Sequence, residues 1–97
     1  MPDYILLMHD DAGAYDEAAW EPYLRGLRER HAFEGGSEVG DGLCVRKQGA
    51  APPVTAHLVG YVRVSAADLD GAKALLAGNP HFEAGGTVEI RELPRSG

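Results

Sequence analysis

A short apolar run at residues 4–8 is the strongest constraint on the fold of this chain. It reads Tyr-Ile-Leu-Leu-Met, with polar residues on either side. Successive side chains of a strand point to opposite faces of a sheet, so the run predicts a short strand buried on both faces. A sheet built around such a strand needs cover on two sides, and this requirement shapes the rest of the prediction.

A helix with one apolar stripe is predicted between Asp16 and His31, where apolar residues recur at steps of three and four. Pro22 interrupts this pattern, because proline removes a hydrogen bond and clashes with the preceding turn of a helix. We therefore expect a separate turn at residues 16–20 and a regular helix from about Glu21. The stripe consists of Ala19, Trp20, Tyr23, Leu24, Leu27 and His31.

Three further strands are predicted at residues 43–47, 55–65 and 87–93. A glycine-rich loop at residues 35–42 precedes the first of them. A second helix lies between the last two strands and ends at Gly78. Ser65 and Asp68 have the spacing of a capping box at its start. Its apolar stripe consists of Leu69, Ala72, Leu75 and Leu76.

The resulting order is βαββαβ, so the predicted fold is α+β of the ferredoxin-like type, with an antiparallel four-stranded sheet. The strands at 4–8 and 55–65 are the most apolar and should lie in the middle of the sheet. Two helices can cover one face of such a sheet. We therefore expect a homodimer, in which a second copy covers the face that bears Tyr4, Leu6 and Met8.

Composition restricts the partners of the protein. The chain has 97 residues and a formal net charge of −6, and we expect a single domain at residues 1–97. Excess negative charge disfavours nucleic acids and anionic membranes. No stretch reaches the roughly 18 apolar residues of a membrane span, and no leader is visible, so a cytoplasmic location is expected. The single cysteine, Cys44, cannot form an internal disulfide.

Cofactor and metal sites are not expected from the sequence. Gly40 and Gly42 form a Gly-x-Gly pair without the third glycine or the following helix of a nucleotide-binding loop. The four histidines lack the spacing of a preorganised metal site. We interpret His31 as a partly packed residue at a helix end and His81 as a cap or surface residue.

The candidate catalytic residues are His9, Asp10 and His57. His9 closes the first strand and Asp10 follows it, which places an imidazole beside a carboxylate as acid–base catalysis requires. His57 begins the strand at 55–65, and antiparallel pairing with the first strand would bring it close to His9. Trp20 and Tyr61 are the candidate ligand-binding residues of an adjacent apolar wall. The alternative is a solvated polar turn without a function.

Four landmarks of the chain are similar to one known family. They are the strand at residues 4–8 with its acidic continuation, the Gly35-Gly36 pair, the Gly60-Tyr61 pair, and the segment from Asn79 to Leu93. The chain resembles the YCII-related (DGPF) family of small α+β proteins, and this resemblance implies a dimeric α/β barrel. The Asp-Gly-Pro-Phe segment that names one branch is replaced here by residues 51–57, Ala-Pro-Pro-Val-Thr-Ala-His. In the compact branch a helix histidine pairs with an acid; Asp41 could stand for that acid, but Trp20 and Tyr23 occupy the corresponding part of the helix.

Two classes of function follow from the sequence and the resemblance. The first is a non-catalytic or accessory protein that binds a small apolar or organic-acid metabolite in a cavity of the dimer. The second is a cofactor-free lyase, isomerase or oxygenase that uses a His/Asp pair. Residues 51–57 contain no acid in place of the Asp of the Asp-Gly-Pro-Phe segment, and this difference favours the first class.

Overall fold

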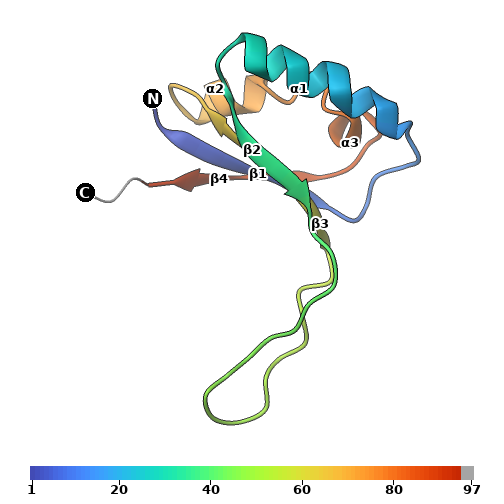
Figure 1. Ribbon diagram of the computed structural model, residues 1–97, viewed down its shortest axis with the longest axis vertical. Helices are drawn as coiled ribbons and strands as arrows, with labels where there is room; N and C mark the ends of the chain where they lie inside the picture. The colour runs from blue at the N-terminus through green and yellow to red at the C-terminus, as the bar shows by residue number, and fades with distance from the viewer. Residues whose placement is uncertain (95–97) are drawn as a thin grey trace.

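The protein is an α+β structure with an open, antiparallel four-stranded sheet, as expected (Figure 1). The computed structural model describes residues 1–94. The strands are β1 (Asp3–His9), β2 (Phe33–Glu38), β3 (Leu58–Ser65) and β4 (Val88–Leu93). The helices are α1 (Trp20–Glu29), α2 (Leu69–Ala74) and α3 (Pro80–Glu83), with a 3₁₀ turn η1 (Glu17–Ala19) before α1. The strand order is β2-β3-β1-β4, so β1 and β3 lie in the centre of the sheet.

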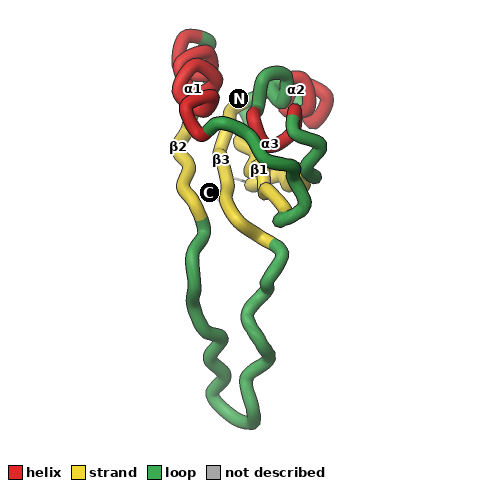
Figure 2. Tube along the Cα trace, turned by 90° about the vertical axis from the view of Figure 1, so that its right-hand side faces the viewer, coloured by secondary structure: helices red, strands yellow, loops and turns green. Residues whose placement is uncertain are grey.

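The helices gather on one face of the sheet, and β1 alternates between that face and the opposite one (Figures 1 and 2). Tyr4, Leu6 and Met8 point toward the helices and are 5%, 0% and 4% exposed. They form the core together with helix residues such as Leu27 and Leu76. The prediction that these three strand residues form a dimer interface is therefore wrong, because the protein's own helices cover them.

The opposite face of the sheet, which we call the open face, has no helix over it among residues 1–94. Ile5 and Leu7 lie on this face and are half-buried between neighbouring strands. In the strand register Leu7 is opposite Tyr61 on one side and Glu89 on the other. The open face is therefore a mixed surface, apolar along β1 and charged toward β4.

The second strand lies earlier in the chain than predicted. The expected strand at residues 43–47 is wrong, because β2 is formed by Phe33–Glu38 through the glycine pair that was interpreted as a loop. A Cβ at Gly36 would lie 2.7 Å from the carbonyl oxygen of Tyr61, and Gly35 has a φ of +122°. Both glycines are thus required by close strand pairing with a bulge.

Residues 39–57, which we call the arm, form a long loop that projects away from the sheet (Figures 1 and 2). Two hydrogen bonds are made within it. Cys44 Sγ contacts the carbonyl oxygen of Pro53 at 3.6 Å, and Arg46 Nη1 donates to the carbonyl oxygen of Ala50 at 3.1 Å. Leu43 and Val45, from the run predicted as a strand, are 78% and 81% exposed.

The first helical region is close to the prediction. The separate turn is confirmed as η1, in which the Asp16 side chain accepts a hydrogen bond from the backbone N–H of Ala18. Pro22 lies in the first turn of α1, where backbone N–H groups have no intrahelical partner, so it does not interrupt the helix. His31 is exposed with a φ of 57°, so its predicted packing on the stripe is wrong.

The second helical region differs more from the prediction. Asp68, not Ser65, caps α2, and its carboxylate accepts a hydrogen bond from Gly71 N at 2.8 Å. The short helix α3 was not predicted. Asn79 caps it by accepting a hydrogen bond from Phe82 N at 3.0 Å, and proline follows at the first helical position. This turn buries His81, which is 3% exposed, so its assignment as a surface residue is wrong.

Candidate functional site

The two predicted catalytic histidines meet at the end of β1. The rings of His9 and His57 are in edge-to-face contact, with their centroids 5.0 Å apart. Antiparallel pairing is the cause, since His9 is opposite Leu58 in the register. Asp10 contacts this pair through its backbone, since its N–H donates to the carbonyl oxygen of His57 at 2.8 Å. The side chain of Asp10 is exposed.

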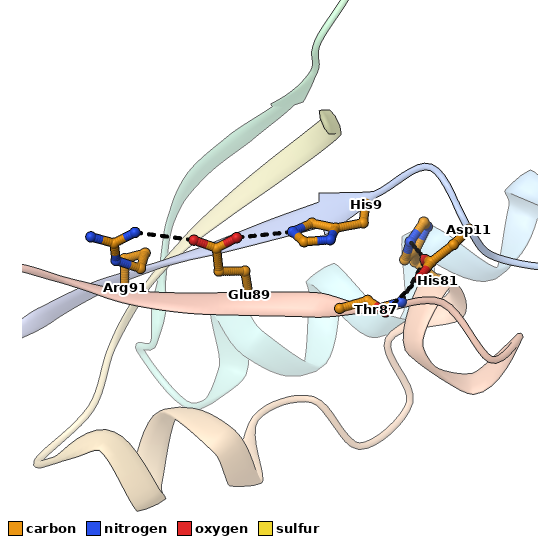
Figure 3. Close-up of polar contacts among 6 residues, drawn as sticks. All are labelled: His9, Asp11, His81, Thr87, Glu89 and Arg91. Atoms are coloured by element: carbon orange, nitrogen blue, oxygen red, sulfur yellow. Dashed lines mark hydrogen bonds and ion pairs between the residues drawn. The ribbon is translucent and has the colours of Figure 1, made fainter. Parts of the chain in front are cut away.

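The carboxylate beside His9 belongs to Glu89, which sequence reasoning missed. His9 Nε2 and Glu89 Oε1 are 2.9 Å apart, and Arg91 Nη1 donates to the other oxygen of Glu89 at 3.1 Å (Figure 3). The hydrogen bond with His9 and then that with Arg91 lower the pKa of Glu89 below its ordinary value. The sequence does contain a signal for this pair. Glu89 and Arg91 lie two residues apart on β4, so they share one face of the strand, and β4 pairs with β1.

The predicted apolar wall is part of a pocket on the helix side of the sheet. This helix-side pocket lies between α1 and strands β2 and β3 and has a volume of about 410 Å³. The residues that line it are Met8, Tyr15, Glu17, Trp20, Leu24, Phe33, Gly36, Ser37, Glu38, Val59, Gly60, Tyr61, Val62 and His81. Trp20 and Tyr61 are among them, whereas the predicted catalytic histidines are not.

The predicted site is therefore divided between the two faces of the sheet. Met8 points into the helix side, and the next residue, His9, points to the open face, because successive strand residues alternate. Tyr61 precedes the buried Val62 on β3 and is opposite Leu7 in the register, so its side chain belongs to the open face. Trp20 is the one predicted site residue whose helix places it over the pocket.

His81 supplies a buried polar group to the helix-side pocket. Its ring is in edge-to-face contact with Tyr15 at 6.3 Å between centroids, and within residues 1–94 its Nε2 has no hydrogen-bond partner. Gly86 packs directly against the imidazole, since a Cβ at that position would lie 2.5 Å from Nε2. The imidazole therefore borders the pocket with its ring, while its Nε2 is buried against the backbone of Gly86.

Asp11 lies at the outer side of His81. Its Oδ1 is 3.9 Å from His81 Nε2, and its two oxygens accept hydrogen bonds from Thr87 N at 2.7 Å and Thr87 Oγ1 at 2.5 Å (Figure 3). The hydrogen bonds from Thr87 are the main cause of a lowered pKa for Asp11. The loop after β1 is thereby tied to the start of β4, and the carboxylate remains ionised beside the buried imidazole.

Residues 1–94 contain no group of three or more His, Cys, Asp or Glu side chains arranged to hold a metal ion. Cys44 lies in the arm, where its Sγ contacts the carbonyl oxygen of Pro53. Among the helices of the described residues, none is long and apolar enough to cross a membrane.

Neither protein-family models nor curated proteins give a match to this chain.

Proposed function

We propose that this protein is a cytoplasmic, YCII-related member of the ferredoxin-like fold that binds a small, largely apolar metabolite in the helix-side pocket, in a non-catalytic or accessory role. The observation that carries the proposal is the pocket itself. A volume of about 410 Å³ lies within the range of small-molecule sites, roughly 300–1,000 Å³. Met8, Leu24 and Val62 give it an apolar wall, and His81 and Tyr15 add a few polar groups.

The single tryptophan of the chain makes the proposal testable, because Trp20 lines the pocket and reports on its occupancy. Titration with the neutral probe phenylpropanol should change Trp20 fluorescence in a saturable manner. Leu24→Phe, which adds volume in the pocket, should weaken this binding at least tenfold. Leu75→Phe is the matched control, since Leu75 is a partly buried helix-layer residue outside the pocket. Equal binding by both variants would contradict the assignment of the site.

We also propose that the protein is a homodimer that buries the open face. The supporting features are the half-buried Ile5 and Leu7, the neighbouring Tyr61, and the resemblance to the YCII-related family, which implies a dimeric α/β barrel. Light scattering should give twice the chain mass of 10.3 kDa, and Leu7→Lys should give the mass of one chain. Ala74→Lys, on the exposed side of α2, should leave the dimer intact. A monomeric parent protein at micromolar concentration would contradict this part of the proposal.

A second candidate function is acid–base catalysis at the open face. The favouring observation is the 2.9 Å contact between His9 Nε2 and Glu89 Oε1, since a carboxylate that orients a histidine is typical of general acid–base pairs. His57 would shield one side of the His9 ring. The test is protein-dependent deuterium incorporation from D₂O into a panel of enolisable keto acids. Incorporation that disappears in His9→Gln would favour the enzyme, and no incorporation by the parent protein would favour the binding protein.

A further inference from the structure

We infer that the helix-side pocket selects an organic cation, an amine or quaternary ammonium group attached to an apolar body. This inference rests on the proposed function and specifies the class of ligand. It is carried by two features of the lining that point the same way: aromatic rings and uncompensated carboxylates. Organic acids, one of the two ligand classes expected from the sequence, fit these features poorly.

Three aromatic side chains from different elements border the pocket: Tyr15, Trp20 and Phe33. The rings of Tyr15 and Trp20 lie 6.5 Å apart at 66°, so they form two walls that meet at a steep angle. The faces of aromatic rings carry partial negative charge, and walls of this kind attract ammonium groups. Phe33 already attracts a cation, because the Arg28 guanidinium lies 4.9 Å from its ring centroid. Arg28 itself is not part of the lining.

Two carboxylates border the same pocket from separate elements. Glu17 belongs to η1 and Glu38 ends β2, and no ion pair involves either of them in the described part of the chain. None of the described lining residues is Lys or Arg. The one lining side chain that can become cationic is His81, whose Nε2 already faces the Asp11 carboxylate at 3.9 Å. Negative charge at the pocket is thus left for a ligand to balance.

An anionic ligand would meet these two carboxylates in a protein whose net charge is already −6. A neutral apolar ligand would gain only the burial of its surface. A cationic apolar ligand gains that burial together with attraction to the rings and to Glu17 and Glu38. The order of affinity that follows is cation above neutral molecule above anion.

The test uses three probes with the same phenylpropyl body: phenylpropylamine, phenylpropanol and phenylpropionate. Isothermal titration of the full chain should show the amine binding at least tenfold more tightly than the alcohol, and the carboxylate most weakly. The preference for the amine should shrink as salt is raised, because screening weakens exposed charge interactions. The double variant Glu17→Gln/Glu38→Gln should lower the affinity for the amine toward that for the alcohol and leave the alcohol unchanged. Glu92→Gln, which removes one exposed acid outside the pocket, should change neither.

The outcomes separate this inference from the proposed function. Equal binding of amine and alcohol, both weakened by Leu24→Phe, would overturn cation selection while the binding function stands. A preference for the amine that is undiminished in the double variant would also overturn the inference, because Glu17 and Glu38 would then contribute nothing to the selection. If no probe binds, the proposed function and the inference both fail.

Discussion

Along β1 the two faces of the sheet carry similar apolar residues, but the helices cover only one of these faces (Figure 2). Leu6 is 0% exposed under the helices, whereas the adjacent Leu7 is half-buried on the open face. Alternation along β1 separates the two sets of side chains, but it does not indicate which set the helices cover. That choice depends on the register with β3 and β4, which is set by residues far away in the sequence. An apolar strand therefore predicts that both faces of the sheet need to be covered. It does not predict which face the helices cover.

The largest expected effect comes from the neighbouring leucines. Leu6→Ala should destabilise the fold by about 2–5 kcal/mol, because it leaves a cavity in the closed core. Leu7→Ala should cost less than about 1.5 kcal/mol in the monomer, since its side chain is already partly solvated. Denaturant melts of both variants at low protein concentration provide the measurement. Equal losses would contradict the difference between the two faces, and a larger loss for Leu7 would mean that their assignment is reversed.

A second comparison concerns two glycines of the helix side. Gly86→Ala should cost about 1–3 kcal/mol, since its Cβ would meet the His81 ring and the Ala12 side chain. Gly26→Ala, in α1 with no atom within 4 Å of the added Cβ, should instead stabilise by about 0.5–1 kcal/mol. Thermal melts check both signs. Tolerance of alanine at residue 86 would show that His81 is not held against the backbone there.

The charged side of the open face should respond to acid. The pKa of Glu89 is lowered by its hydrogen bonds with His9 and Arg91, so the folded protein binds this proton less readily than the unfolded chain. Its contribution is present at neutral pH and is lost as pH falls through and below about 4. Glu89→Gln should therefore lose less stability than the parent between pH 6 and pH 3. Glu92→Gln, on the same strand, should keep the acid sensitivity of the parent, and identical profiles for all three proteins would contradict this account.

The arm should show the smallest effect on the fold. Leu43→Ser and Val45→Ser remove apolar side chains that are already exposed, so each should change the free energy of unfolding by less than about 0.5 kcal/mol. The same substitutions within a strand would cost more. Loss of stability at either position in the monomer would show that this segment packs on the sheet.

The sequence predicts elements well where local chemistry agrees with the tertiary structure. The apolar run of β1, the turn capped by Asp16 and the stripe containing Leu27 are recovered because spacing and capping are local signals. β2 was missed because Gly35 and Gly36 signal a turn locally but serve close strand pairing here. α3 was missed although Asn79 followed by proline is a common helix start.

The candidate site was predicted only in part, because several of its contacts depend on tertiary structure and not on local signals. The meeting of His9 and His57 follows from antiparallel pairing, which sequence order implies. Glu89 depends on the register between β1 and β4, and the buried position of His81 depends on a helix of four residues. Neither the strand register nor a helix of four residues can be derived from local periodicity alone.

Mapping chemical shifts on binding tests the central claim most directly, because it asks which face of the sheet holds the ligand. Phenylpropanol is titrated into labelled protein, and the side-chain signals of Trp20, Leu24 and Val62 are compared with those of Ile5 and Leu7. The account predicts saturable shifts at the first three residues, with the last two unchanged. Shifts confined to Ile5 and Leu7 would place the ligand on the open face and contradict the account.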